Sequence, residues 1–137
     1  MPVVGYDHVA IPTADSERFI EFYKRIGFNI LSEQEWREGK SPIFKVQLGP
    51  NNIINVHPAG LIASLRGDAA IPGCGDLCFV WEGTMDEVLD ILKRAEAPVI
   101  GGPSPRTGGR AAGVATSQSC YIRDPDGNLL EFMVYDR

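Results

Sequence analysis

Residues 124–133 read DPDGNLLEFM, a run of turn-forming residues followed directly by alternating apolar and polar positions. Asp, Pro, Gly and Asn favour tight turns, so we predict that this stretch joins two strands, residues 116–123 and 128–135, as a hairpin. Side chains alternate between the two faces of a strand. Glu131 therefore lies on one face of the last strand, opposite a uniformly apolar face.

A similar stretch occurs earlier in the chain, where residues 52–55 (NIIN) match residues 128–131 (NLLE). Each stretch begins the last strand of a series that reads strand, helix and three strands, which predicts a duplicated βαβββ unit. We assign residues 5–58 to the first unit, 59–74 to a linker and 75–136 to the second unit of a single domain. The expected strands are 6–11, 28–36, 42–48, 52–57, 75–82, 98–101, 116–123 and 128–135, and the expected helices are 15–26 and 85–95.

Local signals mark the ends of both helices. Gly27 is a stop signal for the first helix, and Thr84 with Glu87 forms a capping box at the start of the second. Apolar residues recur on one face of each helix, as a helix covering a sheet requires. These residues are Phe19, Phe22, Tyr23 and Ile26 in the first helix, and Val88, Leu89, Leu92 and Ala95 in the second.

The composition limits the classes of function. The chain has 137 residues, 44% of them hydrophobic, which suffices for a core of ordinary size. A net charge of −5 without long charged runs argues against nucleic acid and acidic membrane surfaces as partners. We find no stretch apolar enough to span a membrane and no signal-peptide pattern. Three cysteines without zinc-knuckle spacing favour a reducing, cytoplasmic location.

Strand alternation places the metal-competent residues opposite the apolar faces. His8 in the first strand and His57 in the fourth are the two histidines of the chain, and both fall on such a face. Asp76 and Glu131 occupy the corresponding faces in the second unit. Two imidazoles with one or two carboxylates suit a divalent ion such as zinc, nickel, cobalt, manganese or ferrous iron.

Three motifs carry a family resemblance: the opening YDHVAIPTAD, the segment GDLCFV and the closing DPDGNLLEFM. Together they resemble the glyoxalase/bleomycin-resistance/extradiol-dioxygenase, or vicinal oxygen chelate, superfamily. PGCGDLCF, the NVH strand end and GPSPRTG resemble its lactoylglutathione lyase-like, virulence-associated subgroup. The resemblance implies an α+β fold in which the curved mixed sheets of two tandem βαβββ units form a metal-binding cup.

In that superfamily the first and last strands of each unit offer metal ligands. Carried over one position at a time, the ligand positions are His8, Asp76 and Glu131, with either Asn55 or His57 in the fourth strand. We take His8, His57 and Glu131 as the metal ligands and leave the choice between Asn55 and His57 open. Extradiol dioxygenases usually have a second histidine at the position of Asp76, and this chain departs from that pattern.

The resemblance implies three alternative functions. The first is a glyoxalase-like lyase or isomerase acting on a small oxygenated metabolite or its thiol conjugate, whose adjacent oxygens chelate the metal. In it Glu131, or else Asp76, moves the proton beside the carbonyl. The second is an Fe(II)-dependent ring-cleaving dioxygenase. The third is a metal-free drug-binding protein of the bleomycin-resistance kind, which predicts a large aromatic-lined groove, whereas alternation assigns Trp81 to the core face.

Substrate and subunit contacts complete the prediction. Residues 101–113 are rich in Gly and Pro, so we expect an irregular lid whose Arg106 and Arg110 hold an anionic group of the substrate. Ser119 and Tyr121 are expected to face the cup, and Asn55 to contact the substrate if it is not a ligand. By family analogy the chain is expected to be a homodimer in which each cup takes one unit from each subunit.

Overall fold

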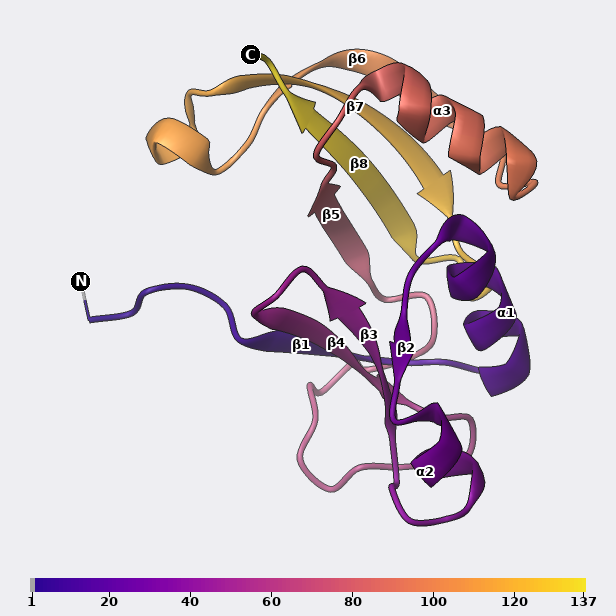
Figure 1. The fold of residues 1–137 in the computed structure, drawn as a ribbon. Coiled ribbons are helices and arrows are strands. Elements are labelled where there is room, and N and C mark those ends of the chain that lie inside the picture. The colour runs from indigo at the N-terminus through magenta and orange to yellow at the C-terminus, as the bar shows by residue number, and fades with distance from the viewer. Residues whose placement is uncertain (1) are drawn as a thin grey trace. The chain divides into compact units, whose positions relative to one another are not determined.

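In the computed structural model, which describes residues 2–137, the chain divides after Cys74 into two units that follow the same element order. Each unit contains a curved, four-stranded mixed sheet (Figure 1). Their strand orders are β1-β4-β3-β2 and β5-β8-β7-β6; the first pair in each is parallel and the others are antiparallel. The predicted α+β class and duplicated βαβββ order are confirmed.

The first unit consists of β1 (His8–Pro12), α1 (Ser16–Ile26), β2 (Ile30–Leu31), α2 (Glu33–Arg37), β3 (Phe44–Leu48) and β4 (Asn52–His57). The second consists of β5 (Asp76–Val80), α3 (Met85–Arg94), β6 (Gly101–Thr107), the short 3-10 turn η1 (Arg110–Gly113), β7 (Thr116–Arg123) and β8 (Leu129–Tyr135). Within residues 2–137 no helix has the length and apolar character that crossing a membrane would require.

The helix α1 covers one face of the unit 1 sheet. The Asp15 carboxylate accepts a hydrogen bond from the Arg18 N–H and caps the N-terminus, and Gly27 ends the helix in the left-handed conformation. The apolar face of the helix is fully buried, with the Phe19 ring 5.7 Å from the ring of Phe44 in β3. Burying each such side chain stabilises the fold by about 1.5–3 kcal/mol.

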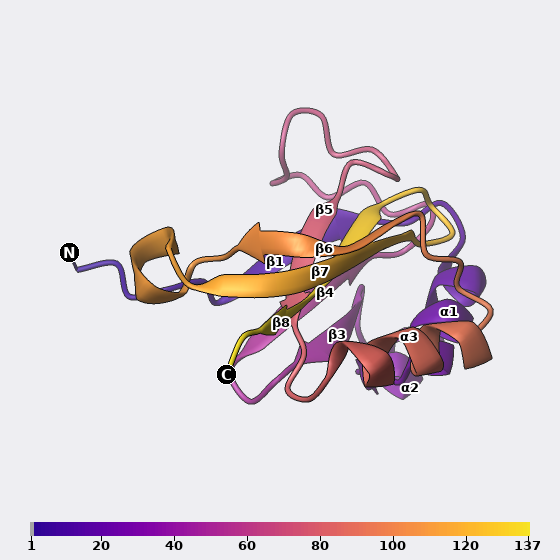
Figure 2. The ribbon, with the colours of Figure 1, turned by 90° about the horizontal axis from the view of Figure 1, so that it is seen from above.

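The helix α3 lies along one side of its own sheet (Figure 2) and packs against β8. Thr84 caps the helix as predicted, since its hydroxyl accepts a hydrogen bond from the Glu87 N–H, whereas the Glu87 carboxylate accepts a hydrogen bond from the Trp81 indole. Val88 and Leu92 are completely buried, as are Leu130 in β8 and Ile122 in β7. The apolar faces of helix and sheet thus form the core of this unit.

The turn before β8 is held by two fully or nearly buried polar side chains. The Asp124 carboxylate accepts hydrogen bonds from the Asn128 N–H at 2.9 Å and from its side-chain amide at 2.7 Å. The side-chain Oδ1 of Asn128 in turn accepts a hydrogen bond from the Gly75 N–H at 2.7 Å. The DPDGN motif therefore fixes the hairpin and also anchors the residue that precedes β5.

Asn128→Ala is expected to destabilise the protein by about 2–3 kcal/mol, because the Gly75 N–H loses its acceptor and buried Asp124 loses one donor. Urea unfolding followed by circular dichroism would measure the change. Asn51→Ala, in an exposed turn, is the matched control and is expected to change stability by less than about 0.5 kcal/mol. Equal effects of the two substitutions would contradict this account.

Three expected elements are wrong. Residues 28–36 were predicted as one strand, but the strand is confined to Ile30–Leu31 and Glu33–Arg37 form α2. The helix is held by ion pairs: Glu33 binds Lys24 of α1 at 2.6 Å and Arg37, four residues on, at 2.9 Å. Arg37 also reaches Glu17 of α1 at 2.7 Å, so these ion pairs join α2 to α1.

The second error concerns residues 101–113, which were predicted to be irregular. Gly101–Thr107 instead form β6, paired antiparallel with β7. The strand expected at residues 98–101 is the third error, because residues 98–100 lie before β6 and are not in a strand. Proline lacks an N–H donor and is tolerated at a sheet edge or a bulge. β6 is an edge strand, and its register shifts between Gly101 and Ser104, at the position of Pro103.

The ion pairs of α2 predict a pH-dependent contribution to stability. Hydrogen bonds from Lys24 and then Arg37 lower the pKa of Glu33, and a hydrogen bond from Arg37 lowers that of Glu17. Stabilisation by a carboxylate with a lowered pKa is complete above its ordinary value of 4.5 and is lost as the pH falls through the lowered value. Arg37→Gln is expected to lower the free energy of unfolding slightly at pH 7 and not at about pH 2. Urea unfolding at both pH values would test this, and a pH-independent difference would contradict it.

Candidate functional site

The face of the unit 1 sheet that is turned away from α1 carries three of the predicted site residues. Phe44 packs on α1, and buried residues alternate with partly exposed ones along β3 and β4. The same alternation in β1 and β4 puts His8, Asn55 and His57 on the other face.

The strand register distinguishes the two candidates in β4. In the parallel β1–β4 pair His8 lies level with Ile53, whereas His57 lies level with Pro12. Asn55 is thus two residues along the strand from the level of His8. His57 is four residues along, or about 13 Å at 3.3 Å per residue. The register favours Asn55 as the neighbour of His8.

His8 and Asn55 each have an atom that can coordinate a metal ion. The Asn55 Oδ1 atom is buried and accepts no hydrogen bond from any of residues 2–137. His8 Nδ1 lies 2.8 Å from a carboxylate oxygen of Asp7. A carboxylate at Nδ1 favours the tautomer with hydrogen on Nδ1, which leaves the Nε2 lone pair for a metal.

Unit 2 presents an equivalent face, on which Glu131 is flanked by residues of two other strands. In the β5–β8 pair Cys78 lies level with Glu131 and Asp76 lies level with Leu129. In the β7–β8 pair Tyr121 lies level with Glu131. Cys78, Glu131 and Tyr121 therefore form a row across the sheet. Asp76 is on the same face, two residues along β5 from Cys78.

The two units use the same register for their candidate donors. Asp76 lies two residues from the level of Glu131 in a parallel pair, as His8 does from the level of Asn55. This equivalence makes Asn55 the counterpart of Glu131, in agreement with the match between residues 52–55 and 128–131. Each sheet thus carries one donor pair on its first and last strands.

The thiols near Glu131 do not contribute a nucleophile. Burial, with a smaller effect of the Glu131 charge, raises the pKa of Cys78 to about 12. The same two causes raise the pKa of Cys120 to about 11. In the absence of a bound metal both thiols are protonated at neutral pH, and the thiolate is the nucleophilic form of cysteine.

Hydroxyl and guanidinium groups extend the row beyond Glu131. Arg106 Nε donates a hydrogen bond to the Tyr121 hydroxyl at 3.0 Å, and the guanidinium lies over the Tyr121 ring. Ser119, one level along, is fully buried, and its hydroxyl has no hydrogen-bond partner among residues 2–137. Three of the predicted substrate-binding residues thus lie on the same face as Glu131.

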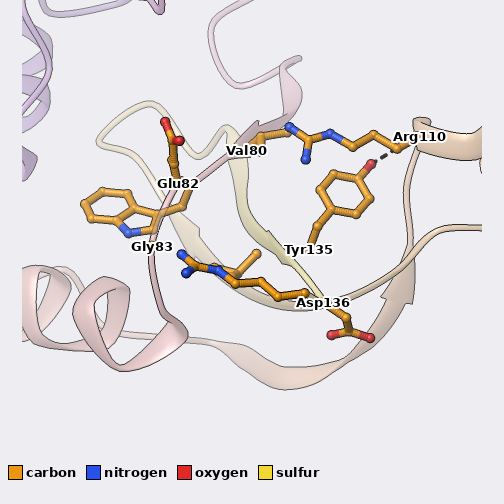
Figure 3. Close-up of a pocket in the computed structure, with 9 residues that line it drawn as sticks. Val80, Glu82, Gly83, Arg110, Tyr135 and Asp136 are labelled. Carbon is orange, nitrogen blue, oxygen red and sulfur yellow. Dashed lines mark hydrogen bonds between the residues drawn. The ribbon is translucent and has the colours of Figure 1, made fainter.

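Arg110 lies elsewhere in the unit, at the far end of β8. Its guanidinium is 4.4 Å from the centre of the Tyr135 ring, and its backbone N–H donates to the Tyr135 hydroxyl at 3.2 Å. Here the structure has a cavity of about 570 Å³ at the C-terminal ends of β5 and β8 (Figure 3). Its lining includes Val80, Trp81, Glu82, Arg110, Tyr135 and Arg137.

Sequence reasoning missed this cavity. Trp81 was expected on the core face by extending strand alternation, but β5 ends at Val80, so the alternation no longer applies. The indole lines the cavity and donates a hydrogen bond to the Glu87 carboxylate at 3.3 Å. Arg106 and Arg110 were predicted to hold one anionic group together, but they contact different tyrosines. Arg106 lies against Tyr121, which is level with Glu131, and Arg110 lies against Tyr135, four residues further along β8.

The candidate ligands on the two sheets meet some of the requirements of a divalent metal site. Among residues 2–137 no group of three or more His, Cys, Asp and Glu side chains is close enough to hold a metal ion. Each unit offers two hard or borderline donors, His8 with Asn55 and Asp76 with Glu131. The buried, unpartnered Asn55 oxygen is what a ligand position would show. Each pair alone offers fewer ligands than the three or four that a protein zinc site usually has.

Comparison with known proteins gives consistent matches along the chain. Residues 5–132 match the family model described as the Glyoxalase/Bleomycin resistance protein/Dioxygenase superfamily. Virulence protein STM3117 of Salmonella typhimurium is 33% identical over 132 residues, covering 94% of this chain and 83% of that protein. Glyoxalase domain-containing protein RDO1 of Mycosarcoma maydis is 30% identical over 135 residues, covering 98% and 70%.

A solved structure has the same fold over its full length. It is the integron cassette protein VCH_CASS1 from the mobile metagenome of V. cholerae, with a TM-score of 0.84 and 27% sequence identity. The alignment covers 99% of this chain and 98% of that one.

Proposed function

The chain belongs to the Glyoxalase/Bleomycin resistance protein/Dioxygenase superfamily, and from that membership we propose that it is a metal-dependent lyase or isomerase of the glyoxalase type. Its substrate would be a small oxygenated metabolite, or a thiol conjugate of one, with two adjacent oxygens. The observation that carries the proposal is the matching donor pair on the two sheets, which includes the unpartnered Asn55 oxygen.

The proposed ligands are His8 and Asn55 from one unit with Asp76 and Glu131 from the other. Neither pair suffices alone, so we propose a homodimer in which unit 1 of one subunit and unit 2 of its partner supply one site. When bound, a zinc, nickel, cobalt, manganese or ferrous ion supplies Lewis-acid stabilisation of the negative charge on the substrate oxygens.

The residues of unit 2 would handle the substrate itself. Glu131 takes the proton from the carbon beside the substrate carbonyl and returns it to the neighbouring carbon, as a general base and then an acid. Tyr121, which lies level with Glu131 and is held by Arg106, orients a substrate oxygen with its hydroxyl. The buried Ser119 hydroxyl is a second hydrogen-bonding group for the substrate.

Parallel assays separate this function from its alternatives. Adducts of α-keto-aldehydes with thiols, and catechols, are offered to protein loaded with each candidate metal, with and without oxygen. Turnover of an adduct without oxygen supports the lyase. Oxygen uptake matched to a ring-cleavage product from a catechol would replace it with the dioxygenase. Tight binding of a drug without any turnover would favour the binding protein.

Paired substitutions in β4 test which residue is the ligand. Asn55→Ala is expected to remove stoichiometric metal, because Asn55 lies beside the level of His8 and its Oδ1 lacks another partner. His57→Ala, two residues on, serves as the matched substitution and is expected to retain more than half of the metal. Elemental analysis of protein purified without chelator measures both. The reverse order of metal loss would assign the ligand to His57.

A further inference from the structure

The lining of the cavity at the ends of β5 and β8 includes two arginines that the proposed reaction does not use. Arg110 and Arg137 both border it, and among residues 2–137 neither has a carboxylate within ion-pair distance. Two carboxylates also belong to the lining. The Asp136 carboxylate accepts a hydrogen bond from the Thr116 hydroxyl at 2.5 Å. Glu82 is exposed. Figure 3 shows the Asp136 carboxylate turned away from Arg110.

The β6–β7 hairpin tip is fixed in the conformation that puts Arg110 over the cavity. Ala111 and Ala112 have φ values of 50° and 54°, in the left-handed region that residues with a Cβ rarely adopt. Tyr135 holds this conformation by accepting the Arg110 N–H and by packing under its guanidinium. Gly108 allows the close approach, because a Cβ there would lie 2.1 Å from the Tyr135 hydroxyl.

The cavity is separate from the Glu131 row. Tyr135 lies level with Ser117 and Glu131 lies level with Tyr121, so they are four residues apart along β8, or about 13 Å. A molecule that reaches both places is longer than a free three-carbon metabolite. Guanidinium groups that are not ion-paired to a protein carboxylate can bind carboxylate or phosphate through charge-assisted hydrogen bonds.

We propose that the cavity bordered by Arg110, Arg137 and Tyr135 binds a carboxylate or phosphate group at the end of an elongated substrate whose reacting oxygens lie at Glu131. The proposal rests on the proposed function for the identity of the reacting end. The anion site itself does not depend on metal or on turnover. It assigns to Arg110 a role separate from that of Arg106, which lies against Tyr121.

The chain offers a direct reporter for this cavity. It has two tryptophans, and Trp81 lines the cavity whereas Trp36 packs on Phe44 in unit 1. In a Trp36→Phe background all tryptophan fluorescence comes from Trp81. Metal-free protein is titrated with inorganic phosphate and, separately, with acetate, at constant ionic strength. A saturable change in fluorescence is expected with at least one of them, and the stronger of the two identifies the class of anion.

Arginine substitutions decide whether the signal comes from the cavity. Arg110→Gln and Arg137→Gln are each expected to raise the apparent Kd at least about tenfold. Arg66→Gln removes the same charge from the exposed linker and is expected to leave the Kd unchanged. The absence of saturation with both anions, or equal effects of Arg66→Gln and Arg110→Gln, would overturn the proposal. Failure of the lyase assay would leave this titration unaffected, so the two proposals fail separately.

Discussion

Glu131→Gln is expected to lower kcat by about 10²–10⁴-fold while the protein keeps most of its bound metal. The amide has nearly the shape of the carboxylate and retains one oxygen that can coordinate, but it cannot accept a proton from carbon. Glu131 lies between Cys78 and Tyr121 on an otherwise hydroxyl- and thiol-bearing row, and both thiols nearby are protonated at neutral pH. No neighbour in that row replaces the lost base.

The comparison needs two controls. Glu96→Gln makes the same substitution at an exposed position after α3 and is expected to leave both metal content and kcat unchanged. Asp76→Ala removes the other carboxylate of the donor pair, with both of its oxygens, and is expected to cost metal as well as activity. Metal content is read by elemental analysis and kcat in the adduct assay. Full activity of Glu131→Gln would remove Glu131 as the base and transfer that role to Asp76.

Local sequence signals predicted the elements that are stabilised locally. The helix ends at Gly27 and Thr84 and the turn from Asp124 to Asn128 depend on residues within a few positions of one another, and all three were predicted correctly. The α2 helix depends on contacts between Arg37 and Glu17 and between Glu33 and Lys24, across the intervening β2. Such contacts leave no periodic pattern in the sequence, so a strand was predicted there instead.

The candidate site also has some features that local sequence signals predict and others that depend on contacts between distant residues. Strand alternation placed His8, Asn55, Asp76 and Glu131 on their faces, since it needs only the strand itself. The register of β1 against β4 involves two strands more than forty residues apart, and it was needed to set Asn55 before His57. The Arg110 cavity requires a turn with two left-handed alanines to close on Tyr135. Alanine rarely adopts the left-handed conformation, so two successive alanines in the sequence do not predict this turn.

His8→Ala and Glu131→Ala are each expected to abolish stoichiometric metal and activity, and a mixture of the two is expected to recover both in part. His8 belongs to unit 1 and Glu131 to unit 2, and each unit supplies two donors of the proposed site. If a site takes its two units from different subunits, a mixed dimer has one site with both substitutions and one site with neither.

Random exchange of subunits makes about half of the dimers mixed, so about a quarter of all sites are intact. Metal content and activity of the mixture, measured after joint unfolding and refolding, should therefore both approach a quarter of the wild-type values. The double variant His8→Ala/Glu131→Ala mixed with wild-type protein is the matched control. Its mixed dimers carry one substitution in each site, so exchange with it should lower the metal content below the average of the two parents. Two results would contradict a site shared between subunits: no recovery of metal or activity in the mixture, or a monomer in sedimentation at micromolar concentration. If each site were made within one chain, every site in the mixture would still carry one of the two substitutions.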